Sequence, residues 1–271
     1  TICSKIANTN EFCLRGYKKL MHLFDTLKNT KTELEFSGKV RIYLCGVTVY
    51  DDAHIGHART IIVFDVLRRF LESQKIPVEF IQNFTDIDDK IIDRANQEKI
   101  SVRQLAETYT TNYFTDFDGL NVKRATIYPK ATEHIEDMQN LISNLVDKKY
   151  AYLTKNGVYF SVSKFTEYGK LSKKNPDDLV SGARVDIDEE KDNPIDFALW
   201  KFSESEPSWK SQWGKGRPGW HIECSAMSLK YLGENFEIHG GGRDLIFPHH
   251  ENEIAQSESF TSNQLTKIWM H

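Results

Sequence analysis

The sequence predicts an α/β fold in which a parallel sheet carries helices on both faces and is interrupted along the chain by an inserted region. From residue 38 onward, short apolar runs of strand character alternate with amphipathic segments of helical length. Between residues 120 and 215 the alternation of strand and helix patterns stops, and the alternation resumes at residue 218. The two alternating stretches are therefore expected to build one sheet.

Composition sets the broad class. The chain has 271 residues, of which 39% are hydrophobic and 27% are charged, as in ordinary globular proteins. The net charge of -4 argues against a protein that coats nucleic acid. No apolar run approaches the length of a membrane span, and no secretory signal is visible. Four scattered cysteines, at 3, 13, 45 and 224, suit a reducing compartment, so a cytoplasmic location is expected.

The first half of the sheet domain is predicted over residues 20–119. Residues 1–19 show no period and form an unassigned extension, and residues 20–36 are expected to hold an edge strand and a turn. Ser101 is expected to cap a helix, and the segment from Thr85 to Asp88 fits the capping pattern of another. The predicted elements that follow residue 38 are a strand over 39–45, a helix over 56–73, a strand over 77–83 and helices over 86–97 and 101–117.

The insertion is predicted over residues 120–215, and the second half of the sheet domain over 216–271. In the insertion, a helix over 131–148 precedes a hairpin marked by Asn156-Gly157. The polar stretch from Lys170 to Asn193 is interpreted as a mobile segment. After it, the pattern predicts a helix over 219–232, a strand over 236–239, a helix over 248–259 and a strand that starts at 267.

The motif His54-Ile55-Gly56-His57 lies where the first strand of the sheet passes into the first long helix. Histidines three residues apart share one face of a helical turn. Helix N-termini carry unpaired N–H groups that attract phosphate, and Gly56 lets a flat ring or a backbone approach. The motif thus predicts a binding site for a nucleoside triphosphate. The alternative is a polar start of the helix that binds no ligand.

Cys45, Cys224, His249 and Glu253 are candidate metal ligands. Cys45 ends a strand at the sheet edge where α/β proteins bind ligands, and His249 and Glu253 share a helix face. Two thiolates, an imidazole and a carboxylate suit tetrahedral zinc. The alternatives are buried cysteines that act as small apolar residues and a surface contact between His249 and Glu253. His250 is a rival ligand.

Three further features leave alternatives open. Gly240-Gly241-Gly242 follows a strand and indicates either close backbone approach to a ligand or a loose turn. Trp220, one helical turn before Cys224, either walls a pocket or belongs to the core. The Thr85 hydroxyl, at the end of the second strand, meets a ligand, caps the next helix, or does both.

Six stretches of the chain together resemble class I cysteinyl-tRNA synthetase. They follow one another in the family's order with similar gaps and cover about residues 20–271. Such a set is more specific than any single motif. The stretches are Leu44 to Asp51, His54 to Arg59, Asn83 to Lys90, Arg217 to Met227, Ile238 to Gly242 and Asp244 to Glu253.

The resemblance implies a Rossmann-type catalytic domain split by a connective insertion. It implies one zinc ion per chain, held by Cys45, Cys224, His249 and Glu253, and so favours His249 over His250. It also implies that His54 and His57 are catalytic and contact the phosphates of ATP. The remaining site residues that it implies are Gly56, Gly240, Gly241, Gly242 and Asp244 for ATP, and Gly46, Thr48, Thr85, Trp220 and His239 for the amino acid.

The implied function is that of a cysteine–tRNA ligase. L-Cysteine and ATP, the latter with Mg²⁺, would give cysteinyl-adenylate and pyrophosphate, and tRNA(Cys) would then accept the cysteinyl group. Zinc binds a thiolate readily and a neutral hydroxyl poorly, so the metal would separate cysteine from serine. No membrane partner is implied, and a monomer is expected.

The chain departs from the family pattern in two ways. It lacks the Lys-Met-Ser-Lys-Ser motif and the anticodon-binding domain, so the chain by itself is expected to activate cysteine poorly or not at all. No role is assigned to Cys3 or Cys13. The alternative functions are a related ligase that passes cysteine to an amino-sugar in mycothiol synthesis, a non-catalytic zinc module, and a nucleotide-binding protein without zinc.

Overall fold

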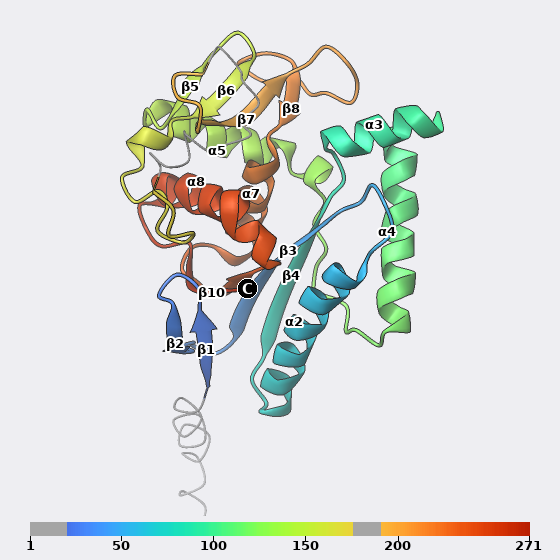
Figure 1. The fold of residues 1–271 in the computed structure, drawn as a ribbon, viewed down its shortest axis with the longest axis vertical. Helices are drawn as coiled ribbons and strands as arrows, with labels where there is room; N and C mark the ends of the chain where they lie inside the picture. The colour runs from blue at the N-terminus through green and yellow to red at the C-terminus, as the bar shows by residue number, and fades with distance from the viewer. Residues whose placement is uncertain (1–20, 176–190) are drawn as a thin grey trace, which may run out of the picture.

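The computed structural model describes residues 21–175 and 191–271. The predicted extension over 1–19, with Cys3 and Cys13, lies outside the described residues, as does most of the polar stretch predicted over 170–193. Figure 1 shows the arrangement of the elements along the chain.

A parallel four-stranded sheet forms the centre of the molecule. Its strands are β3 (Val40–Thr48), β4 (Val78–Thr85), β9 (Phe236–Gly240) and β10 (Thr266–Met270). Their order across the sheet is β10-β9-β3-β4, and every pairing is parallel. Because β3 pairs with both β4 and β9, the two alternating stretches of the sequence do build one sheet, as predicted.

Helices cover both faces of this sheet because the side chains of its strands alternate between two cores. Ile42 and Leu44 of β3 pack in one core with Phe64 of α2 (Ile55–Ser73). Tyr43 and Cys45 pack in the other core with residues of α7 (Trp220–Leu232) and α8 (Glu251–Thr261). The predicted α/β class is confirmed, and the sheet is a Rossmann-type one.

Two helices after β4 begin at capping residues. Ser101 accepts a hydrogen bond from the backbone N–H of Gln104 and caps α4 (Val102–Gly119), as predicted. Asp88 caps α3 (Asp89–Glu98), which starts three residues later than predicted. The capping role considered for Thr85 is wrong, because Asp88 is the N-cap residue of α3; the Thr85 hydroxyl donates to a buried glutamate of α7.

The chain after α4 runs along β4 before the next helix. Ile127 and Lys130 form parallel bridges with Ile81 and Phe84. The helix predicted over 131–148 is divided into a short 3-10 turn, η2 (Ala131–Glu133), and α5 (Ile135–Asp147). The division lies at His134, whose imidazole contacts the Lys130 carbonyl at 2.8 Å and the Tyr231 hydroxyl at 3.0 Å.

A second, antiparallel sheet stands at one end of the molecule (Figure 1). It consists of β5 (Ala151–Leu153), β6 (Gly157–Phe160), β7 (Phe197–Phe202) and β8 (Gly216–Pro218), in that order. The sequence pattern did not predict β7 and β8, which are short and separated by a polar loop. A further 3-10 turn, η3 (Val162–Lys164), follows β6.

The predicted hairpin exists, but its turn lies one residue earlier. Leu153 pairs with Val158, and Thr154 donates its backbone N–H to the Gly157 carbonyl at 2.8 Å, which leaves Lys155 and Asn156 as the turn. Gly157 is required for a different reason. A Cβ there would lie 2.1 Å from the Trp200 carbonyl oxygen on β7.

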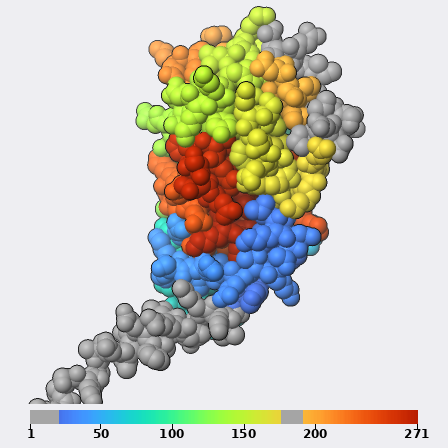
Figure 2. Space-filling model, turned by 90° about the vertical axis from the view of Figure 1, so that its left-hand side faces the viewer, coloured from blue at the N-terminus to red at the C-terminus, as the bar shows by residue number. Residues whose placement is uncertain are grey.

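A small hairpin of β1 (His22–Asp25) and β2 (Thr30–Glu33) lies in the region where one edge strand and a turn were predicted. It adjoins β10: the Thr26 N–H donates to the Trp269 carbonyl at 2.8 Å, and Asp25 accepts from the Trp269 N–H at 3.2 Å. Figure 2 shows this hairpin, in blue, directly beneath the red C-terminal segments. Among the described residues, no helix is both long and apolar enough to cross a bilayer.

Candidate functional site

The site begins at an irregularity in β3. Leu44 pairs with Gln82 and Val47 with Phe84, so β3 has one residue more than β4 between these pairs. The extra residue is a β-bulge, which redirects side chains next to it. The bulge contains Cys45 and Gly46.

Gly46 is fixed by packing against β4. A Cβ at this position would lie 1.6 Å from the Asn83 carbonyl oxygen, so only glycine fits. The Gly46 N–H donates to the Asn83 side-chain oxygen at 2.9 Å, and that oxygen also lies 3.6 Å from the Cys224 sulfur. Gly46, predicted to bind substrate, therefore has a structural role that brings β3, β4 and α7 together.

The four predicted metal ligands meet in the interior. The Sγ atoms of Cys45 and Cys224, a ring nitrogen of His249 and a carboxylate oxygen of Glu253 all lie within 4.8 Å of one another, and all four residues are buried. Cys45 Sγ is 3.2 Å from Glu253 Oε1, and His249 Nε2 is also 3.2 Å from that oxygen. These residues come from β3, α7, the turn before α8, and α8 itself.

A second set of four ligand atoms overlaps the first. Cys45 and Glu253 also lie within 4.8 Å of His239 and His250. His239 Nε2 is 2.9 Å from Glu253 Oε2, and His250 Nε2 is 3.8 Å from Glu253 Oε1. His250, the rival ligand in the sequence, is thus at the site, and His239 joins it from the end of β9.

The turn that carries the two histidines is irregular. The helix predicted from residue 248 begins at Glu251, and Phe247 within the preceding turn η5 (Ile246–His250) has extended backbone angles. Glu251 and Asn252 point away from the cluster, because their side chains bond to residues of the insertion. Glu251 accepts the backbone N–H groups of Gly169 at 2.9 Å and Ser172 at 2.7 Å, so it fastens the insertion to α8.

Neighbours outside the cluster orient His249. Its Nδ1 lies 3.0 Å from Nδ1 of His221, so its Nε2 is the nitrogen that faces the cluster. The Trp220 ring lies 4.3 Å from the His249 ring, centroid to centroid. Trp220 is 38% exposed, which rules out the core position that was one alternative for it. Such outer contacts fix the ring orientation of a metal-binding histidine.

The protonation of these groups follows from their burial. Burial raises the pKa of the Cys45 and Cys224 thiols, and it lowers the pKa of His249 to about 3. Burial alone would raise the pKa of Glu253, but His239 and His249 beside it hold the pKa below its usual value. The cluster therefore offers a carboxylate, a neutral imidazole and two thiols that release protons when a metal binds.

This donor set fits zinc. Two sulfur atoms, one imidazole nitrogen and one carboxylate oxygen are all ligands that zinc takes, and the residues that carry them are held by separate elements. The set of Cys45, His239, His250 and Glu253 supplies only one sulfur atom. Both sets contain Cys45 and Glu253, and they differ in that one offers the Cys224 thiolate where the other offers a second imidazole. Because a soft thiolate is a strong zinc ligand that also brings negative charge, we expect the two-thiol set to be preferred.

Thr85 and Thr48 lie side by side at the carboxyl ends of β4 and β3, where they pair in register. The Thr85 hydroxyl donates to Glu223 Oε2 at 2.8 Å. Burial raises the pKa of Glu223 well above its usual value. Because the Thr85 hydroxyl donates its proton to Glu223 of α7, the Thr85 oxygen can still accept a hydrogen bond from a ligand.

The two histidines of the first motif form a cap on α2. His54 is the N-cap residue, and its Nδ1 accepts the N–H groups of Gly56 at 3.1 Å and His57 at 3.4 Å. His57 Nδ1 in turn accepts the His54 N–H at 3.3 Å. The expectation that these helix N–H groups are free to bind phosphate is wrong, because His54 uses two of them. The rings stack with centroids 3.8 Å apart.

Gly56 is needed for this cap. A Cβ on Gly56 would lie 2.8 Å from Cε1 of the His54 ring, so a larger residue would displace the imidazole. Since both Nδ1 atoms accept hydrogen bonds, each neutral ring carries its proton on Nε2. Burial lowers the pKa of His57, with His54 as a second cause. In this arrangement the Nε2–H of each ring is the group that can donate to a ligand.

Gly240 is the last residue of β9, and Gly241 and Gly242 follow it; we call these three residues the glycine turn, and their backbone packs closely against the protein. A Cβ on Gly240 would lie 2.2 Å from the Phe64 ring, and one on Gly241 would lie 2.8 Å from the His250 ring. A Cβ on Gly242 would lie 2.4 Å from a carboxylate oxygen of Asp244. The neighbours that exclude larger residues belong to the protein itself.

The same turn connects the two halves of the site. Asp244, in the short turn η4 (Arg243–Leu245), lies close enough to His57 to raise its pKa against the effect of burial. On the other side of the turn, His239 reaches the metal cluster. The end of β9 therefore spans the distance between the histidine cap of α2 and the buried ligands.

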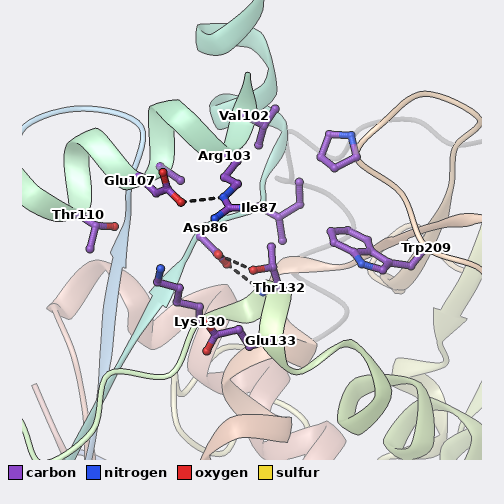
Figure 3. A pocket seen from close by; sticks show the side chains of 12 residues that line it. Asp86, Ile87, Val102, Arg103, Glu107, Thr110, Lys130, Thr132, Glu133 and Trp209 are labelled. Atoms are coloured by element: carbon purple, nitrogen blue, oxygen red, sulfur yellow. Dashed lines mark hydrogen bonds and ion pairs between the residues drawn. The ribbon is translucent and has the colours of Figure 1, made fainter. Parts of the chain in front are cut away.

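A pocket of about 440 Å³ lies next to this site, between α4 and the loop that precedes β8 (Figure 3). Asp86, which follows Thr85, points into it and accepts two hydrogen bonds from Thr132, at 2.9 and 2.6 Å. Lys130 and Trp209 also line it. None of the predicted site residues is among its lining residues.

Sequence reasoning missed several residues at the site. His221, Glu223, Asn83 and Tyr43 all contact or adjoin the predicted ligands. His221 precedes Cys224 by three residues on one helix face, which is a signal that could have identified it. Asn83 and Tyr43 have no such signal, because the bulge in β3 decides what they face.

The chain is similar in sequence to curated cysteine–tRNA ligases. It is 59% identical over 258 residues to the "Cysteine--tRNA ligase" of Thermodesulfovibrio yellowstonii, with 93% of this chain and 53% of the relative covered. It is 58% identical over 254 residues to that of Caldicellulosiruptor saccharolyticus, with 93% and 55% covered. The chain thus spans about half the length of the curated relatives it matches.

Solved structures support the fold at lower identity. Mycobacterium tuberculosis methionyl-tRNA synthetase in complex with methionyl-adenylate aligns with a TM-score of 0.67 and 13% identity, over 87% of this chain and 57% of that one. A family profile described as tRNA synthetases class I (C) catalytic domain matches residues 31–271. With most of its length in that match, the chain belongs to the family of class I (C) tRNA synthetase catalytic domains.

Proposed function

We propose that this chain is the part of a cysteine–tRNA ligase that activates L-cysteine with ATP, with zinc as the ion that distinguishes cysteine from serine. The observation that carries the proposal is the buried cluster of Cys45, Cys224, His249 and Glu253. Two thiols are an uncommon pair to bury beside a carboxylate unless a metal binds them. The relatives' names support the same substrate.

The amino acid would lie between the cluster and the ends of β3 and β4. Zinc in this cluster would supply a bond to the substrate thiolate, which a serine hydroxyl forms poorly at neutral pH. The Thr85 oxygen, whose own proton goes to Glu223, can accept a hydrogen bond from the substrate ammonium group. Trp220 would form a wall over His249, against which it already packs.

ATP would lie over the N-terminus of α2, near the glycine turn. The cysteine carboxylate oxygen would form a bond to the α-phosphorus, and the bond from that phosphorus to the bridging oxygen of pyrophosphate would break. His54 and His57 would donate hydrogen bonds from Nε2 to the phosphate oxygens as negative charge builds up on them. Since the cap holds both rings before ATP arrives, little reorganisation is needed.

The proposed partners are therefore L-cysteine, ATP with Mg²⁺, and tRNA(Cys) as acceptor of the cysteinyl group. The residues proposed for ATP are His54, Gly56, His57, Asp244 and the glycine turn, and those for the amino acid are Gly46, Thr48, Thr85, Trp220 and His239. Gly46 and the three glycines would act through the close backbone packing described above. Transfer to tRNA is proposed for the longer protein.

Calorimetric titration of the zinc-loaded chain with L-cysteine, and separately with L-serine, tests the proposal. We expect cysteine to bind only when zinc is present, and serine to give no signal. Cys224→Ser should abolish cysteine binding, because it removes one thiolate from the cluster. Ser228→Ala, one turn further along α7 and also buried, is the matched control and should bind cysteine normally.

Two results would contradict the proposal. One bound zinc ion without any cysteine binding would favour a metal module without catalytic function. ATP binding that is indifferent to cysteine and zinc, in a chain that does not bind cysteine, would favour a plain nucleotide-binding protein.

A further inference from the structure

Helix α2 is apolar on two opposite sides. One side, with Ile61, Phe64, Leu67 and Leu71, is buried against the sheet. A second stripe is exposed to solvent, although it too consists of large apolar residues. Its members, defined here as the outer stripe, are Ile55, Ile62, Val63, Val66 and Phe70.

The helical repeat places the members of the outer stripe on one side of α2. At about 100° per residue, Ile55, Ile62, Val66 and Phe70 fall on one line along the helix, with Val63 at its margin. The stripe extends over roughly 22 Å, from the histidine cap almost to the end of α2. Val66 is 61% exposed and Phe70 is 51% exposed. Apolar residues on two opposite sides are typical of a helix that other protein segments cover on both of those sides.

The rest of the described chain leaves the stripe uncovered. Polar neighbours at its flanks pair with one another, as in the ion pair of Arg69 with Asp65 at 2.7 Å. Arg59 is the one charged residue near the middle of the stripe, and its long stem can reach the edge of a covering surface. Large exposed apolar patches mark interaction surfaces.

We propose that the outer stripe is the docking surface for the part of the synthetase that this chain does not match. The chain covers 53–55% of its curated relatives, so a segment of similar size remains in each of them. Domains of one chain pack against each other through interfaces that resemble protein–protein interfaces, and exposed apolar patches mark such surfaces. The segment that covers α2 would hold the helix of the histidine cap, and it would present an apolar face to Val66 and Phe70. This inference needs only family membership and is independent of the proposed substrate.

Side-chain footprinting with a carbene reagent tests the proposal. The proteins are this chain and the full-length relative from Thermodesulfovibrio yellowstonii, each at two concentrations. In this chain, Val66 and Phe70 should label strongly. At the matching positions of the full-length relative, labelling should fall about fivefold, because buried side chains exclude the reagent. Leu153, which is 51% exposed on the antiparallel sheet, is the control within each chain.

Each other outcome overturns the inference. Equal labelling of the matching positions in the full-length relative would show that nothing in that chain covers them. Protection that appears only at the higher protein concentration would show that a second copy covers the stripe. A relative truncated to the matched region should regain the labelling, and its failure to do so would assign the protection to the catalytic part itself.

Discussion

The imidazole of His54 stacks on that of His57, with ring centroids 3.8 Å apart, and each Nδ1 accepts a backbone N–H of the same helical turn. This reciprocal arrangement is a capping box built from two histidines. It satisfies helix donors and at the same time fixes which ring nitrogen carries a proton. The residues that stabilise the start of α2 are thus the residues proposed to bind phosphate.

The two roles of His54 can be separated by substitution. His54→Asn keeps a good N-cap and removes the imidazole, so the melting temperature should stay within about 2 °C of the parent while ATP affinity falls. His54→Ala removes both functions and should also cost about 1 kcal/mol of stability. Thermal unfolding and ATP titration measure the two effects. If His54→Asn binds ATP like the parent, the imidazole is not a ligand.

The choice between the two overlapping ligand sets is tested by His249→Gln and His250→Gln. We expect His249→Gln to lose most of the bound zinc, because His249 belongs to the set with both thiols. His250→Gln should keep zinc close to one ion per chain. Elemental analysis of the purified proteins gives the metal content. The reverse pattern would assign the ion to His239 and His250.

Zinc affinity should rise steeply with pH. Burial raises the pKa of both thiols, so zinc must displace a proton from each. The pKa of His249 lies at about 3, and that of Glu253 is held below its usual value, so neither contributes a proton near neutral pH. With two protons released, affinity should increase about 100-fold per pH unit below the thiol pKa values. Competition with a chelator between pH 6 and 8 measures the slope.

A smaller slope of zinc affinity against pH would indicate that fewer protons are released. If affinity increases only about tenfold per pH unit, zinc displaces a proton from a single thiol. That result would contradict the set that contains Cys45 and Cys224, and it would favour Cys45 with His239 and His250.

Truncating the side chains of two adjacent α2 residues to alanine should change the free energy of unfolding by very different amounts. Leu67 is buried, and Leu67→Ala should cost about 2–5 kcal/mol of unfolding free energy through lost packing and a cavity. Val66 is largely exposed in this chain, and Val66→Ala should change stability by less than about 0.5 kcal/mol. Denaturant unfolding of both variants is the measurement. A large effect of Val66→Ala would show that the outer stripe is already packed in this chain.

The sequence predicted the sheet and most of the helices well, because strand and helix patterns depend on local periodicity. The α2 helix predicted over 56–73 lies at Ile55–Ser73, and the four strands of the parallel sheet were located to within a few residues. Errors occurred where one side chain redirects the backbone. His134 interrupts the helix predicted over 131–148, and the extended backbone of Phe247 delays the start of α8 to Glu251.

The sequence by itself therefore determined the residue types of the site and the strands and helices that carry them. Only the tertiary structure decided which of them meet: Cys45 and Glu253 are 208 residues apart in the chain, yet their side chains are in contact. The order of the strands brings β9 next to β3, and the bulge at Cys45-Gly46 turns the thiol toward α7 and α8. Strand order and bulge position result from packing between distant segments, and no local pattern encodes them.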